Sequence, residues 1–169
     1  ADLLQLVHAH GLGPHLYADD TQIYGSCRLT DCSLLQSHVS TCINDVSQWM
    51  RSNRLQLNAD KTEVIWFSSA RRQHQIPTAQ FVIGNDVINP VSSVRDLGIY
   101  LDSNLSMRSH VSKTVSACFA SLRQIRSIRR SITRPVLQSL VAALNLTRLD
   151  YGCSTSAGLP ARQLNRLQS

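Results

Sequence analysis

Apolar residues recur at helical spacing in three parts of the chain. Between residues 35 and 50 they lie three or four positions apart, which predicts a helix of about five turns with one apolar face. Stripes at 111–125 and 137–144 predict two more helices, the second capped by Thr133 with Pro135 in its first turn. We expect the buried sides to be Leu35, Val39, Cys42, Ile43, Val46, Trp49 and Met50; then Val111, Val115, Cys118, Phe119, Leu122 and Ile125; then Leu137, Leu140, Val141 and Leu144.

Short β-branched and aromatic runs between these helices predict strands. The pattern indicates a hairpin at 15–24, a strand at 64–67 that lies beside it, a second hairpin at 81–88 and one further strand at 94–101. Strands and one long helix make up the first hundred residues, whereas only helical patterns follow Met107. The chain is therefore predicted to be α+β, with a mixed part at 1–104 and an all-α part at 105–169.

Two adjacent carboxylates, Asp19 and Asp20, fall at the expected tight turn of the first hairpin. Rigid, closely spaced carboxylates are ligands for divalent metal ions, which activate an attacking oxygen and neutralise a leaving phosphate in nucleotidyl transfer. Aspartate is also an ordinary turn residue, so the pair alone leaves both interpretations open.

Lys61 follows a polar turn and precedes the predicted strand at 64–67. A lysine at the start of a strand is able to neutralise phosphate charge or to protonate a leaving pyrophosphate. A solvated surface lysine is the other interpretation.

The charge is strongly polarised along the chain. The formal net charge is +6, with 7 Lys and Arg against 10 Asp and Glu through Met107 and 10 against 1 from Arg108 onward. Such asymmetry indicates a polyanionic partner, most simply nucleic acid, for the C-terminal third. The residues that we expect to contact its backbone are Lys113, Arg123, Arg126, Arg129 and Arg130; a solvated basic face is the alternative.

The cysteine pattern favours a reducing compartment. The five cysteines are odd in number and have no C-x-x-C spacing, so neither a disulfide framework nor a zinc site is predicted. No apolar run is long enough for a membrane span, and no signal peptide opens the chain. We therefore expect an intracellular protein, nuclear or cytoplasmic, that is not secreted and has no membrane partner.

Three segments together resemble successive motifs of the reverse transcriptase of LINE-type (non-LTR) retrotransposons. They are YADDTQIY at 17–24, LNADKTE at 57–63 and LGIYLD at 97–102, in the order and with spacing similar to that family's. The resemblance implies the C-terminal part of a polymerase palm, with antiparallel strands and a packing helix, followed by a thumb-like helical subdomain. It implies Mg²⁺ as cofactor, with Mn²⁺ as a possible substitute, and as partners an RNA template, a DNA primer and dNTPs.

The resemblance also implies roles for single residues. Asp19 and Asp20 match the catalytic, metal-binding pair, and Tyr17 and Ala18 match positions beside the incoming nucleotide and the primer end. Lys61 matches the lysine proposed to assist pyrophosphate departure. The segment Leu97, Gly98 and Ile99 matches the hairpin that contacts the primer's end.

One departure from the family pattern changes the expected activity. The family completes its metal site with a carboxylate on an earlier palm strand, whereas residues 1–12 contain one acid, Asp2, in a helical context. Because this strand and the fingers lie upstream of the hairpin, we expect a reverse transcriptase fragment that is inactive as this 169-residue chain. A non-catalytic nucleic-acid-binding remnant and a non-functional pseudogene fragment are the alternatives.

Overall fold

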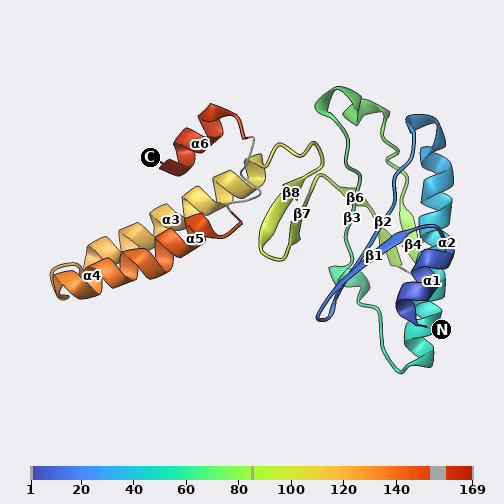
Figure 1. Ribbon diagram of the computed structural model, residues 1–169, viewed down its shortest axis with the longest axis horizontal. Helices are drawn as coiled ribbons and strands as arrows, with labels where there is room; N and C mark the ends of the chain where they lie inside the picture. The colour runs from blue at the N-terminus through green and yellow to red at the C-terminus, as the bar shows by residue number, and fades with distance from the viewer. Residues whose placement is uncertain (1, 85, 153–158, 169) are drawn as a thin grey trace. The chain divides into compact units, whose positions relative to one another are not determined.

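The computed structural model describes residues 2–84, 86–152 and 159–168, and its chain path is drawn in Figure 1. The chain forms two compact units, Ala1–Ser92 and Ser93–Ser169. Each unit has its own helices and strands, and each is described by itself below.

The N-terminal unit is built on two helices, α1 (Leu3–Ala9) and α2 (Cys32–Ser52), which lie side by side. Their apolar faces, with Leu12 from the connection between α1 and β1, form one core of buried side chains, namely Leu3, Val7, Leu12, Cys42 and Val46. The helix predicted over 35–50 is confirmed, because one side of its 3.6-residue period packs into this core. His10 Nε2 lies 2.9 Å from Asp45 Oδ2 and joins the end of α1 to the middle of α2.

Three pairs of short strands complete this unit. Strand β1 (Gly13–Tyr17) pairs antiparallel with β2 (Asp20–Tyr24), and β4 (Phe81–Ile83) pairs antiparallel with β5 (Asp86–Ile88), so both predicted hairpins are confirmed. The β4–β5 hairpin buries Phe81, Ile83 and Ile88 in a second core, to which Val39 and Ile43 of α2 contribute.

The predicted neighbour of the third strand is wrong. Strand β3 (Val64–Ile65) pairs in parallel with β6 (Pro90–Val91) and not with the first hairpin. Short helical turns lie between the strands, η1 (Leu29–Asp31), η2 (Ala59–Lys61) and η3 (Ala70–Gln75).

The C-terminal unit begins with the hairpin of β7 (Ser93–Asp96) and β8 (Ile99–Asp102). The single strand predicted at 94–101 is therefore wrong, because Leu97 and Gly98 both take positive φ angles, 43° and 87°, and reverse the chain. Strand β8 packs on the long helix α3 (Arg108–Ile128).

The remaining helices pack along α3. They are α4 (Arg134–Val141), the π-helical segment η4 (Ala142–Leu146), α5 (Thr147–Asp150) and α6 (Ala161–Gln168). In Figure 1, α4 and α5 form one continuous rod beside α3.

Two of the expected buried faces differ in detail. Helix α3 buries Val111, Thr114, Cys118 and Ile125, whereas Phe119 and Leu122 are exposed. Leu144 is also exposed, and Asn145 is buried in its place, because the wide π-helical turn shifts which residue faces inward.

The elements of both units together give a mixture of helices and small sheets, which agrees with the predicted α+β class. The compact units divide between Ser92 and Ser93, since β8 packs on α3, whereas the domains predicted from the change of period divide after residue 104. That second division stays a prediction. None of the helices in the described ranges combines the length and the hydropathy that crossing a bilayer requires.

Candidate functional site

The first hairpin exposes the two neighbouring carboxylates at a two-residue turn. Tyr17 pairs with Asp20, so the turn consists of Ala18 and Asp19, one position before the pair predicted from the sequence. All four residues are exposed. Ala18 has a φ of 53°, in the left-handed region that costs a residue with a side chain about 1 kcal/mol or more. The turn therefore holds a strained backbone directly beside Asp19.

The hairpin is attached to the unit at its base. Ile23 packs against the core shared by α1 and α2, whereas residues next to the turn lie in solvent. At the same end, a Cβ atom on Gly13 would lie 2.5 Å from ring atoms of Tyr24, so only glycine permits the tyrosine ring to cover the opposite strand. A fixed base and an exposed tip give Asp19 and Asp20 a defined place on the surface.

The two carboxylates do not make up a complete metal site. Oxygen ligands of this type suit Mg²⁺ and Mn²⁺, but paired ions need several such ligands. Within residues 2–84, 86–152 and 159–168, no group of three or more His, Cys, Asp or Glu side chains is placed to hold an ion. The described residues alone therefore do not fit a two-metal centre.

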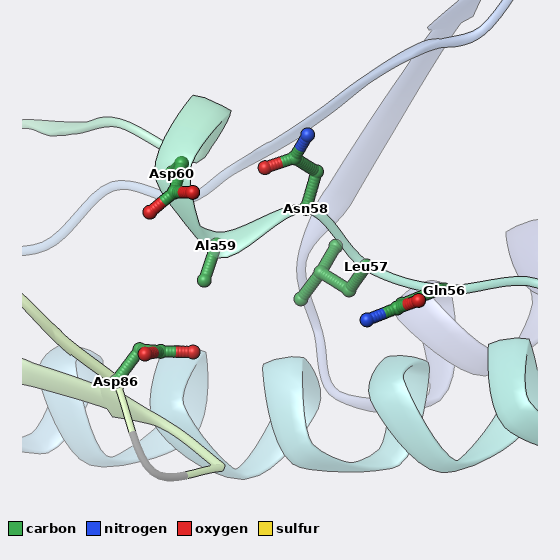
Figure 2. Close-up of a pocket in the computed structure, with 6 residues that line it drawn as sticks. All are labelled: Gln56, Leu57, Asn58, Ala59, Asp60 and Asp86. Carbon is green, nitrogen blue, oxygen red and sulfur yellow. The ribbon is translucent and has the colours of Figure 1, made fainter.

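The predicted lysine lies at the end of η2 in the same unit. Its backbone N–H donates to Asn58 Oδ1 at 3.3 Å, which caps this short turn, and its side chain is exposed. An open cavity of about 440 Å³ lies beside the turn, and Figure 2 shows Asp60 and Asp86 on opposite sides of it. The described residues that line this cavity include two carboxylates and no basic group, so its own chemistry does not favour a phosphate.

The predicted primer-contacting segment forms the tip of the second unit's hairpin. Leu97 and Gly98 are the two turn residues, and Ile99 begins β8. The hydroxyl of Tyr151, just after α5, donates a hydrogen bond to the carbonyl oxygen of Leu97. The same ring lies against Gly98, where a Cβ atom would come within 3.2 Å of it. The hairpin tip is thus attached to the residue that follows α5.

A cavity of about 640 Å³ lies between this hairpin and the helices. Three cations line it, Arg95 from β7, Lys113 from α3 and Arg148 from α5, and its described lining contains no carboxylate. Two of these cations make cation–π contacts with the ring of Tyr100. Lys113 Nζ lies 3.9 Å from the ring centroid and Arg95 Cζ lies 5.8 Å from it. We call this cavity the cationic pocket.

Two buried titratable residues, His110 and Asp102, join the hairpin to the start of α3, and His110 also lines this pocket. His110 Nδ1 accepts a hydrogen bond from the Tyr100 backbone N–H at 3.5 Å, and burial lowers the pKa of its ring. Burial alone would raise the pKa of the Asp102 carboxyl, but hydrogen bonds from Ser109, Ser106 and the Arg108 backbone outweigh it and lower that pKa. Asp102 Oδ2 lies 2.9 Å from Ser106 Oγ and 3.2 Å from the Ser109 nitrogen, so this carboxylate caps the start of α3.

The basic residues predicted to contact nucleic acid fall into two groups. Lys113 belongs to the cationic pocket. Arg123 and Arg126 are exposed at the other end of α3, at least about 15 Å further along the helix, and the exposed Arg129 and Arg130 directly follow its last residue. Sequence reasoning missed Arg95, Arg148 and Tyr151. Arg95 lies in the acidic part of the chain, and the other two are brought to the hairpin only by the packing of α5.

The chain was compared with known proteins, and no family model, curated protein or solved structure matches it.

Proposed function

We propose that the chain is the palm and thumb portion of an RNA-directed DNA polymerase of the LINE-type reverse transcriptase family. The resemblance of the three motifs at 17–24, 57–63 and 97–102 supports this proposal. Under it, Asp19 and Asp20 supply carboxylates to a metal centre that needs a further ligand strand, and Tyr17 and Ala18 lie beside the nucleotide. Lys61 supports departure of pyrophosphate.

One structural observation carries the proposal furthest. The motif resemblance assigns the primer's end to Leu97, Gly98 and Ile99, and the hairpin that these residues form borders the cationic pocket. Three cations without a carboxylate among the described lining residues suit the sugar-phosphate backbone of a nucleic acid, and the two tyrosines of the pocket offer apolar ring surface beside them. The chemistry of the second unit therefore agrees with a role in holding an RNA–DNA duplex.

Catalysis by paired metal ions requires further oxygen ligands beside Asp19 and Asp20, and the described residues place none there as a group of three or more. We therefore propose that the 169-residue chain by itself binds template and primer without extending them. The additional carboxylate belongs on a palm strand that precedes the first hairpin in the family pattern.

The experiment is to read the gene in frame upstream of Ala1 and to express the longer chain. An Asp-bearing strand about sixty to a hundred residues before Asp19 is expected from the resemblance, together with template-dependent incorporation of dNTPs in Mg²⁺. Asp19→Asn abolishes that incorporation, whereas the matched change Asp31→Asn, at an exposed aspartate of the same unit, leaves it intact. Incorporation that survives Asp19→Asn overturns the proposal.

A non-catalytic nucleic-acid-binding module is the second candidate. The exposed arginines at the end of α3 and the cationic pocket favour it without any reference to the Asp pair. The primer-extension assay on the longer chain distinguishes the two candidates, because a binding module binds a hybrid duplex and never extends its primer. A pseudogene fragment without function is a third interpretation, and cooperative unfolding of the purified chain argues against it.

A further inference from the structure

Two cysteines of the N-terminal unit lie with their sulfur atoms close together. Cys27 follows β2 in the irregular connection to η1, and Cys32 is the first residue of α2. The Cys27 thiol donates to the Cys32 sulfur, with 3.6 Å between the two Sγ atoms, and the Cys32 thiol donates to the Arg28 carbonyl oxygen at 3.6 Å. A disulfide needs about 2.05 Å, so the sulfurs must approach by about 1.5 Å.

The two thiols differ in how easily a reagent reaches them. Cys27 is exposed, whereas Cys32 is buried, as are Cys42 and Cys118. Cys153 lies outside the described residues. A small oxidant therefore meets Cys27 first, with a second thiol already beside it.

We propose that Cys27 and Cys32 are a site of reversible oxidation that forms an intramolecular disulfide, with a low-molecular-weight disulfide such as oxidised glutathione as the oxidant. The Cys27 thiolate attacks one sulfur of that disulfide, whose S–S bond breaks and releases one thiol. The Cys32 thiolate then attacks the Cys27 sulfur of the mixed disulfide and releases the second thiol. The protein loses two protons and two electrons, and the oxidant is reduced to two thiols.

The environment of Cys27 makes this a slow reaction. Partial burial, the hydrogen bond to Cys32 and the nearby Cys32 and Asp31 raise the pKa of the Cys27 thiol to about 11. Since only the thiolate attacks, the rate falls about tenfold for each unit by which the pH lies below that pKa. The site accordingly responds to sustained oxidation and not to brief exposure.

The disulfide closes a six-residue loop directly between the first hairpin and α2. It fixes the connection that leaves β2 to the first turn of the helix, in the unit that carries Asp19 and Asp20. This inference does not depend on the proposed polymerase activity.

The test uses the full 169-residue chain with Cys153→Ser in every sample, so that the described cysteines alone react. After incubation with oxidised glutathione, we expect non-reducing mass spectrometry to show the loss of two hydrogen atoms in the peptide that contains both cysteines, reversed by dithiothreitol. Cys27→Ser abolishes this product, whereas the matched changes Cys42→Ser and Cys118→Ser, at buried cysteines, leave it.

Two results overturn the inference. One is a mixed disulfide with glutathione that accumulates on Cys27 and is never resolved by Cys32. The other is no reaction of Cys27 at all, even at the alkaline pH where it is alkylated by iodoacetamide. Because Cys27 is exposed, its serine variant is expected to keep the fold, which circular dichroism checks.

Discussion

The hydroxyl group of Tyr151 donates a hydrogen bond to the backbone carbonyl of Leu97, a residue 54 positions earlier in the chain. This contact joins the tip of the β7–β8 hairpin to the end of α5, and the tyrosine ring covers Gly98 beside it. The turn that the motif resemblance assigns to the primer is therefore held by a helix that follows it by some fifty residues. Its position depends on the packing of α4, η4 and α5 along α3.

We expect Tyr151→Phe to loosen the hairpin tip without unfolding the unit. The change removes the donor to Leu97 but keeps the ring on Gly98, and because Tyr151 is 55% exposed the destabilisation is about 0.5–1 kcal/mol. Hydrogen exchange of the β7 and β8 amides measures it. Tyr24→Phe, at a tyrosine that is 62% exposed in the other unit, is the control and leaves that exchange unchanged. Equal exchange in wild type and Tyr151→Phe would show that the contact does not hold the hairpin.

Asp102 is expected to make the C-terminal unit sensitive to acid. Its pKa in the folded chain lies below the ordinary 3.8, so its stabilisation is complete above about pH 5. As the pH falls below 3.8, the unfolded chain takes up a proton that the folded carboxylate does not, and the stabilisation disappears when the pH passes the lower, folded value.

Asp102→Ala removes this acid dependence and costs roughly 1–3 kcal/mol at neutral pH, because the Ser109 N–H is left without its buried acceptor. Hydrogen exchange of the first turns of α3 at pH 7 and at acid pH checks both effects. Asp150→Ala, at an exposed aspartate of the same unit, serves as the matched change. An acid dependence that persists in Asp102→Ala contradicts the assignment of the cap.

Ala18→Gly is expected to stabilise the N-terminal unit by about 1 kcal/mol. Glycine adopts the left-handed φ of 53° without the strain that alanine bears there. Urea unfolding followed by tryptophan fluorescence is suited to this measurement, since both tryptophans, Trp49 and Trp66, belong to this unit. Ser37→Gly, at an exposed position in the second turn of α2, is the comparison and destabilises. If Ala18→Gly also destabilises, the turn is not strained as described.

The arginines at the end of α3 are expected to contribute to duplex binding by neutralising phosphate groups. Changing all four to Gln lowers the slope of log affinity against log salt by up to about 0.9 for each phosphate that is no longer neutralised. The four are Arg123, Arg126, Arg129 and Arg130. The control carries the same charge change at exposed arginines of the N-terminal unit, Arg28, Arg51, Arg71 and Arg72. Identical salt slopes for the two variants would place the duplex elsewhere.

Local physical rules were enough to predict part of this structure from the sequence. The helix over 35–50 follows from its periodic apolar face, and the first hairpin was predicted within one residue because turn chemistry is local. The pairing of β3 with β6 was not predicted, because strands of two residues carry no periodic signal and the two strands lie far apart in the sequence.

The same limit applies to the candidate sites. Asp19, Asp20 and Lys61 were found from short motifs, whereas Arg95, Arg148 and Tyr151 meet only after the helices of the C-terminal unit have packed. The pattern of β-formers at 94–101 predicted one continuous strand, whereas the motif resemblance implied a hairpin there. The positive φ angles of Leu97 and Gly98 form the turn of that hairpin. The contact between the thiols of Cys27 and Cys32 has no spacing signature in the sequence.

The most direct test of the account is the binding of an RNA–DNA hybrid duplex by a variant whose cationic pocket carries no charge. The variant changes Arg95, Lys113 and Arg148 to Gln, and its control makes the same change at Arg28, Arg71 and Arg72. Binding is measured by fluorescence anisotropy between about 50 and 200 mM salt, because the number of neutralised phosphates sets the salt dependence of the affinity. We expect weaker binding and a shallower salt slope for the pocket variant alone. Equal affinity and slope for the two variants, or no binding by the wild type at low salt, would contradict it.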